Sequence, residues 1–217
     1  MIALAIGNYL GDNMNHIYYI GGSPCCGKST IAEKISKKYG FQYYKPDDFL
    51  TEFIEEGVKD GDEWLKYISE MSLDELWLRA PEKMHEEELL TYEKLFPYFM
   101  AELDKLNKNT PIITEGAAFL PDLVYKIGVE KTRYICVVPT REFQIYHYSK
   151  RLWVNDYLSS CSDKEKAFSN WMERDVLFAL SASKQAKEKG YATLVVDGNK
   201  GIDENQLFIE KCFELSG

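Results

Sequence analysis

Five short apolar runs are spaced along the chain, and the segments between them have the periodicity of amphipathic helices. The runs cover residues 16–21, 41–44, 111–115, 132–138 and 191–197. Strands that alternate with helices in this way predict an α/β fold with a five-stranded parallel sheet. Ligands of such sheets bind at the carboxyl ends of the strands, so the residues directly after each run are the first candidates for chemistry.

The helical segments differ in length and in burial pattern. A helix is predicted from Lys28 to a C-terminal cap at Gly40, and a last helix is predicted over 203–215. The segment 50–106 is too long for a plain crossover and predicts a helical insertion between the second and third strands. In it, six apolar residues recur at steps of three and four: Leu89, Tyr92, Phe96, Phe99, Leu103 and Leu106. We expect this stripe to pack in the core, with a bend before Pro97.

The rest of the insertion is predicted to be more exposed, and it is rich in aromatic residues. Its candidates for contact with a substrate are Trp64, Tyr67, Trp77 and Arg79. Two interpretations stay open, since these side chains either grip an acceptor molecule or simply pack. A lid-like region is predicted further along the chain, at residues 140–170.

Composition limits the classes of protein to consider. A chain of 217 residues suits a single domain, 1–217. The net charge of −9, with no run of Lys or Arg longer than two, disfavours nucleic acid as the main partner. Five cysteines without scaffold-like spacing favour a reducing, cytoplasmic environment. No segment approaches the roughly 20 apolar residues that would cross a membrane.

Two further expectations concern the N-terminus and metals. Residues 1–13 are expected to be a disordered extension or to follow a misassigned start, because Met14 lies just before the first apolar run. The three histidines, His16, His85 and His147, are scattered without metal-ligand spacing, so no zinc site is predicted.

The strongest chemical signal follows the first apolar run and fits the pattern G-x-x-x-x-G-K-[ST]. It comprises Gly22, Ser23, Pro24, Cys25, Cys26, Gly27, Lys28, Ser29 and Thr30. A strand that opens into a helix through such a loop turns backbone N–H groups onto phosphates, and the helix N-terminus favours the negative charge. The motif therefore predicts a bound nucleoside triphosphate, with Lys28 on the β- and γ-phosphates and the Ser29 hydroxyl on Mg²⁺.

The adjacent cysteines in this loop have two interpretations. Cys25 and Cys26 are either small side chains that the loop tolerates, which we favour, or a redox switch that blocks phosphate binding when a thiol is oxidised.

Two carboxylates, Asp47 and Asp48, follow the second apolar run, at the same edge of the predicted sheet as the loop. A carboxylate there would orient an acceptor hydroxyl, accept its proton and hold water on Mg²⁺. The alternative is that one of them caps the following helix, since aspartate is a preferred N-cap.

A third carboxylate, Glu115, ends the third run and is followed by Gly116, which suits a sharp turn beside a ligand. At this position Glu115 is predicted to face Mg²⁺, and the alternative is an exposed glutamate at the end of a strand.

Basic residues follow the fourth run. Four side chains at steps of three, four and three predict one polar helix face: Arg141, Gln144, Tyr148 and Arg151. Arginines that close over phosphates neutralise charge on the transferring group, and a solvated helix face is the alternative. Arg151, beside Lys150, is the preferred candidate, and Arg174 is a weaker one. After the fifth run, the turn at 197–201 is placed where it would contact a nucleotide base.

Together, the glycine loop, the Asp-Asp-Phe after strand two, the Glu-Gly after strand three and the basic helix after strand four resemble the P-loop small-molecule and nucleoside kinases. The motifs are most similar to those of the uridine-kinase and chloramphenicol-phosphotransferase type, with the zeta-toxin-like kinases as a related branch. The resemblance implies a three-layer α/β/α fold with strand order 2-3-1-4-5. It also implies that Asp47 rather than Asp48 is the base, and that Ser29 and Glu115 surround Mg²⁺.

These features predict an ATP-dependent phosphotransferase that acts on a hydroxyl of a small molecule. Lys28, Mg²⁺ and Arg151 would stabilise charge, and Asp47 would align the acceptor. The alternative is a nucleotide-dependent ATPase or interaction protein that uses the acidic helical insertion as its partner surface. Phosphorylation of nucleic-acid ends is a third hypothesis, disfavoured by the acidic charge.

Overall fold

A parallel sheet forms the centre of the protein. The computed structural model describes residues 16–215, so the expected extension at residues 1–13 lies outside the described part of the chain. The strands are β1 (Ile17–Gly21), β2 (Gln42–Tyr44), β3 (Ile112–Glu115), β4 (Tyr134–Pro139) and β5 (Ala192–Val196). They pair in the order β2-β3-β1-β4-β5, and every pair is parallel. The predicted α/β fold class, strand number and strand order are confirmed.

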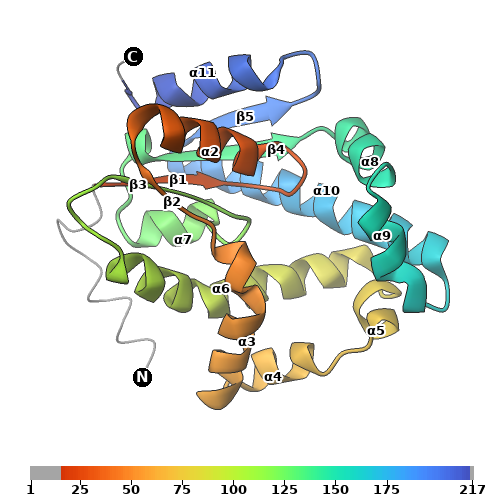
Figure 1. Cartoon of the computed structure of the whole chain (residues 1–217). Coiled ribbons are helices and arrows are strands. Elements are labelled where there is room, and N and C mark those ends of the chain that lie inside the picture. The colour runs from red at the N-terminus through yellow and green to blue at the C-terminus, as the bar shows by residue number, and fades with distance from the viewer. Residues whose placement is uncertain (1–15, 216–217) are drawn as a thin grey trace.

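Helices cover both faces of this sheet (Figure 1). One face carries α2 (Lys28–Tyr39) and α11 (Ile202–Cys212), and the other carries α6 (Pro81–Lys105), α7 (Pro121–Lys126) and α10 (Lys164–Lys189). Side chains of β1 alternate between the two cores: Ile17 and Tyr19 pack against the α6, α7 and α10 face, whereas Tyr18 and Ile20 pack against the α2 and α11 face. Burial on both faces explains why this strand is a continuous apolar run.

The predicted insertion between β2 and β3 is helical throughout most of its length. A 3₁₀ helix (Pro46–Phe49) leads into α3 (Leu50–Lys59), α4 (Glu63–Ser69), α5 (Leu73–Trp77) and α6. Helix α6 continues through Pro97 as one element. Phe96 and Leu103 pack in the core beneath the sheet, whereas Phe99 packs with Phe53 of α3, with ring centroids 5.1 Å apart. The core interpretation of the α6 stripe is therefore correct, and α6 attaches the insertion to the sheet.

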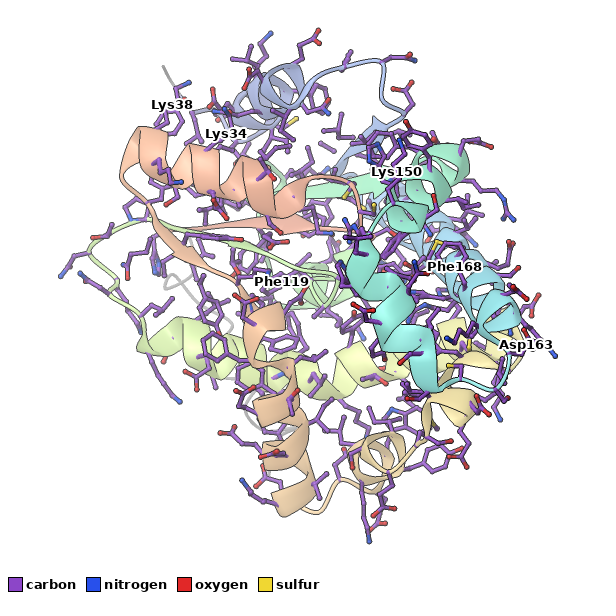
Figure 2. The ribbon with its side chains drawn as sticks, turned by 45° about the vertical axis from the view of Figure 1, so that its right-hand side comes forward. Lys34, Lys38, Phe119, Lys150, Asp163 and Phe168 are labelled. Atoms are coloured by element: carbon purple, nitrogen blue, oxygen red, sulfur yellow. The ribbon has the colours of Figure 1, made fainter. Side chains whose placement is uncertain are left out.

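The segment between β4 and β5 differs from its prediction. It forms α8 (Arg141–Ser149), α9 (Leu152–Tyr157) and a 3₁₀ helix (Leu158–Ser160) before α10. Figure 2 shows Lys150 where α8 gives way to α9, and Asp163 at the start of α10. The single basic helix face is wrong, because α8 ends two residues before Arg151 and both Gln144 and Tyr148 are buried.

Ion pairs connect α2 and α11, the two helices on one face of the sheet. Lys34 and Lys38 of α2 form ion pairs with Asp203 and Glu210 of α11, at 2.9 and 2.7 Å, and both lysines are labelled in Figure 2.

Within residues 16–215, no helix combines the length and the apolar character needed to cross a membrane.

Candidate active site

The glycine loop joins β1 to α2 through backbone conformations that only some residues adopt. Gly22 has φ +109°, and a Cβ there would come within 2.0 Å of the Val137 carbonyl oxygen, so no larger residue fits. Gly27 has φ +81° at the N-terminus of α2. Cys25 also has a positive φ, +64°, at a position where glycine would be unstrained. The motif thus folds as a tight loop that ends at a helix N-terminus, the geometry that binds phosphates.

Lys28 lies beneath this loop with its side chain buried. Its ammonium donates a hydrogen bond to the Ser23 carbonyl oxygen at 2.6 Å and contacts Cys26 Sγ at 3.8 Å. Burial lowers the pKa of Lys28, but nearby Cys26 and Glu115 outweigh it, so the net shift is upward. Lys28 is therefore a positive charge at the base of the loop.

The loop cysteines are uncharged. Cys26 Sγ donates to the Ser23 carbonyl oxygen at 3.0 Å, and burial raises the pKa of both Cys25 and Cys26. Thiols held in the protonated form react slowly with oxidants, which favours their interpretation as small side chains.

An oxygen-rich group lies beside Lys28, at the end of β3. Ser29 Oγ donates to Glu115 Oε1 at 2.8 Å, and the Tyr43 hydroxyl donates to the same oxygen at 3.1 Å. Glu115 is 2% exposed, so the interpretation as an exposed strand-end residue is wrong. A serine hydroxyl and a carboxylate next to a phosphate loop are ligands that suit Mg²⁺, which takes one or two protein carboxylates together with phosphate oxygens. Within the described residues, no group of three or more His, Cys, Asp or Glu side chains forms a complete metal site, so phosphate oxygens and water would complete the coordination.

Asp47 faces the same pocket, whereas its neighbour Asp48 turns away and forms an ion pair with Lys45 at 2.6 Å. Neither aspartate caps α3, whose N-cap residue is Phe49 without a side-chain hydrogen bond, so the capping alternative is wrong. A Cβ on Gly116 would lie 3.0 Å from Asp47 Oδ1, and the glycine therefore leaves room for the carboxylate.

The proton affinity of Asp47 is raised. Its carboxylate keeps a solvent-accessible side but is crowded by protein on the others. This partial burial, together with the charge of Glu115, raises the pKa of Asp47 to about 6, and Lys28 and Lys45 oppose the shift. A carboxylate with this pKa is a stronger base than an ordinary aspartate.

Arg151, the N-cap residue of α9, reaches the loop from the segment between β4 and α10. Its guanidinium donates to Cys25 Sγ at 3.4 Å and lies over the Tyr148 ring at 4.7 Å. The other predicted arginines lie elsewhere: Arg141 is paired with Glu173, and Arg174 is buried in ion pairs with Glu88 and Asp175.

These residues enclose a pocket of about 290 Å³ at the carboxyl ends of β1, β2 and β3. It is lined by Pro24, Cys25, Cys26, Gly27, Lys28, Ser29, Thr30, Asp47, Glu115 and Arg151. Gly22 and Ser23 lie behind this lining, and the buried Ser23 hydroxyl donates to the Asp175 carbonyl oxygen at 3.4 Å. The structure thus brings together side chains from four distant segments of the chain.

The turn after β5 borders a second, open hollow of about 680 Å³. The hollow is lined by Glu142, Phe143, Tyr146, His147, Asp197, Gly198, Asn199 and Lys200. Ile202, which follows this turn, lies beside the glycine loop, because a Cβ on Gly27 would meet Ile202 Cδ1 at 2.9 Å. The segment after β5 is therefore adjacent to the N-terminus of α2.

No protein-family model matches the chain, and no curated protein matches its sequence. Solved structures similar to it include the crystal structure of TT1252 from Thermus thermophilus, with 17% identity, a TM-score of 0.47 and coverage of 93% of this chain and 98% of that one. Dephospho-CoA kinase from Campylobacter jejuni has 16% identity, a TM-score of 0.41 and coverage of 92% and 96%. At these values neither likeness bears on the chemistry of the site, which rests on its own residues.

A third cavity, of about 320 Å³, lies between the insertion and α10. Its lining comprises Leu50, Ile54, Ile68, Met71, Leu76, Trp77, Arg79, Met84, Glu87, Glu88, Thr91, Tyr92, Tyr157 and Arg174. The expectation that Trp77 is exposed is wrong, since it is 9% exposed and stacks on Trp171 with ring centroids 4.6 Å apart. Of the predicted contact residues, Trp77 and Arg79 line this cavity, whereas Trp64 and Tyr67 do not.

Glu88 is one of several residues of this cavity that the sequence pattern did not reveal. It belongs to the acidic run Glu86–Glu88, which is typical of a solvated helix surface. The signal that would have found it is its position one helical turn before Tyr92, on the same side of α6 as the apolar stripe.

Proposed function

We propose that this protein transfers the γ-phosphoryl group of ATP to a hydroxyl of a small molecule, assisted by Mg²⁺. The observation that carries this proposal is the convergence of Lys28, Ser29, Asp47, Glu115 and Arg151 on one phosphate-sized pocket. A loop that only binds nucleotide has no need of a carboxylate with raised proton affinity facing the phosphates, and Asp47 provides one.

Each residue has a role that follows from its position. Backbone N–H groups of the loop and the Lys28 ammonium hold the β- and γ-phosphates. Ser29 and Glu115, with Asp47 through water, would hold Mg²⁺, which supplies neutralisation of charge on the phosphate oxygens. Arg151, which contacts the loop at Cys25, stabilises negative charge on the transferring group.

Asp47 accepts the proton of the acceptor. The hydroxyl oxygen forms a bond to the γ-phosphorus, the bond from that phosphorus to the bridging oxygen breaks, and ADP leaves with the bonding electrons. The hydroxyl proton passes to the Asp47 carboxylate. Because the pKa of Asp47 is about 6, the group is largely ionised at neutral pH and still a useful proton acceptor.

The cavity between the insertion and α10 is the proposed acceptor site. Leu50, which lines it, follows Asp47 by one turn. Burial is the main cause that raises the pKa of Glu88 and Tyr92 in its wall, and the nearby negative charge of Asp47 adds to it. An acceptor bound there would present a hydroxyl to Asp47. The open hollow at Phe143 and Asn199 is the proposed site of the nucleotide base.

The test is transfer of label from γ-labelled ATP to pooled small alcohols, with free phosphate measured in parallel. Lys28→Ala should lower transfer on the order of a hundredfold or more, as expected when a charge that stabilises the transition state is removed. Lys34→Ala, on the exposed side of the same helix, is the matched control and should leave transfer unchanged.

Label on an acceptor that disappears with Lys28→Ala supports a phosphotransferase. Release of phosphate alone, with no labelled acceptor in any pool, would refute the proposal and favour an ATPase or a nucleotide-dependent interaction protein. Ser29→Ala, a smaller change at the same loop, distinguishes loss of chemistry from loss of folding, because it should raise the Mg²⁺ concentration needed for transfer.

A further inference from the structure

The wall of the cavity between the insertion and α10 combines many apolar side chains with a few charged ones. Six aliphatic or sulfur-containing side chains and three aromatic ones form most of the lining: Leu50, Ile54, Ile68, Met71, Leu76, Met84, Trp77, Tyr92 and Tyr157. The charged residues of the lining come from the segment before α6, from α6 itself and from α10. A ligand of this cavity must therefore have an apolar body and a polar end.

At the polar end, two carboxylates depend on a single arginine. Arg174 is the shared partner of two carboxylates, with Nη1 2.8 Å from Glu88 Oε1 and Nη2 2.7 Å from Asp175 Oδ1. The second arginine of the lining, Arg79, is already paired with Glu87. Two buried carboxylates thus share one guanidinium, and both arginines of this cavity already have carboxylate partners.

One carboxylate oxygen of Glu88 has no hydrogen-bond partner among the described residues. Its side chain is 10% exposed, and Oε2 makes no hydrogen bond within the described part of the chain. A buried carboxylate oxygen without a partner is unfavourable unless a proton or a cation compensates it.

The surroundings of Glu88 agree with this deficit of positive charge. Burial raises the pKa of Glu88 to about 8. Arg174 and the Tyr92 hydroxyl oppose the shift, whereas Asp175 and Asp47 add to it. Without a ligand, a proton compensates the carboxylate over much of the neutral range.

We propose that the acceptor is an amino alcohol with an apolar or aromatic body, whose ammonium group binds Glu88 Oε2 inside this cavity. The ammonium donates a hydrogen bond to the unpartnered oxygen, and aromatic lining next to it favours a cation further. Glu88 loses its proton to solvent when the ligand binds. An anionic acceptor is disfavoured, since both arginines of the wall are already neutralised. That the ligand is an acceptor rests on the proposed function, but its binding does not.

The test measures binding of three compounds that differ mainly in charge, by titration calorimetry with the full chain at pH 7. The probes are 2-amino-1-phenylethanol, its neutral counterpart 1-phenylpropan-1-ol and the anion mandelate. We expect the amine to bind at least about tenfold more tightly than either, the ratio for one hydrogen bond to a charged group. Its apparent enthalpy should vary with the ionisation enthalpy of the buffer, because the Glu88 proton is released.

Two variants make the result specific. Glu88→Gln should abolish both the preference for the amine and the buffer dependence, and circular dichroism checks its folding. Glu86→Gln, an exposed neighbour in the same acidic run, should retain both.

Three results would each overturn the inference. The first is equal or tighter binding of the neutral or anionic compound, and the second is no binding of all three at their highest soluble concentrations. The third is an unchanged preference for the amine in folded Glu88→Gln. Amine binding without any phosphoryl transfer would reject the proposed function and leave this inference standing.

Discussion

Replacing Asp47 by asparagine is expected to stabilise the folded protein while it removes the proposed proton acceptor. In the folded protein the pKa of Asp47 is raised from 3.8 to about 6, because burial and Glu115 disfavour its ionised form. A difference of about two pKa units corresponds to at most about 3 kcal/mol. Since water reaches one side of the carboxylate, screening reduces the expected gain from Asp47→Asn to about 1 kcal/mol at neutral pH.

The pH dependence of this gain follows from the direction of the shift. The folded state binds the Asp47 proton more tightly than the unfolded state, so this group makes the wild type less stable as the pH rises from about 4 to about 6. Above that window the loss is complete and constant. The advantage of Asp47→Asn should therefore be small near pH 4, grow up to pH 6 and remain level at pH 7 to 8.

The assay is thermal and urea unfolding of both proteins from pH 4 to 8, with phosphoryl transfer measured on the same samples. At pH 7, Asp47→Asn should raise the melting temperature by about 3 °C and lower transfer by a factor on the order of 10² to 10⁴. Asp48→Asn is the matched control, because it removes only an exposed ion pair with Lys45 and should change stability by less than about 1 kcal/mol with transfer retained. Asp47→Asn that is less stable than the wild type at pH 7, or a stability difference that does not vary with pH, would refute the reasoning.

Two further substitutions test the pocket and the sheet beneath it. Arg151→Ala should lower the single-turnover rate of transfer about a hundredfold. Arg141→Ala should leave the rate unchanged, because the exposed Arg141 side chain pairs with Glu173 outside the pocket. Equal rates for both variants would contradict the role of Arg151. Gly21→Ala would place a Cβ 2.2 Å from the Tyr134 hydroxyl and 2.3 Å from the Phe119 carbonyl oxygen, and should lower the free energy of unfolding in urea by about 3 kcal/mol or more. Gly40 has a positive φ and open space around it, so Gly40→Ala should lower the free energy of unfolding by only about 1 kcal/mol. An equal decrease in the free energy of unfolding for both variants would show that the close contacts at Gly21 are tolerated.

The strands could be predicted because both of their faces are buried. Such strands are continuous apolar runs in the sequence, as Ile17–Gly21 shows. The boundaries were less accurate where nothing local marks them: Lys131–Arg133 forms a 3₁₀ helix rather than the start of β4, and the last helix ends at Cys212 instead of residue 215. These ends are decided by contacts with other elements, which periodicity does not contain.

The same limit explains the failure of the predicted basic helix face. Its spacing from Arg141 to Arg151 is regular, and no Gly or Pro interrupts it. The chain nevertheless turns after Ser149, which allows Tyr148 and Val154 to enter one cluster with Trp171. Burial of these apolar side chains outweighs continuation of the helix.

The phosphate pocket could be predicted because most of its lining is contiguous in sequence and the remaining carboxylates directly follow strands of a parallel sheet. The cavity between the insertion and α10 could not be predicted, since its wall comes from segments as far apart as Leu50 and Arg174. Trp77 illustrates the difficulty, because the ring that buries it, Trp171, lies nearly a hundred residues away.

The main influences on Asp47 and on Glu88 differ, although Asp47 also makes a small contribution to the pKa of Glu88, and this difference matters for a cationic acceptor. An ammonium close to Asp47 would lower the pKa of that carboxylate and weaken it as a base. The charges that set the pKa of Asp47 belong to the phosphate pocket and its rim, namely Glu115, Lys28, Lys45 and Asp48. Glu88 instead responds mainly to its own burial and to Arg174. In the proposed complex, an ammonium held by Glu88 would take the place of a proton that is already there. It would add little net positive charge near Asp47 and would preserve the basicity on which the proposed transfer depends.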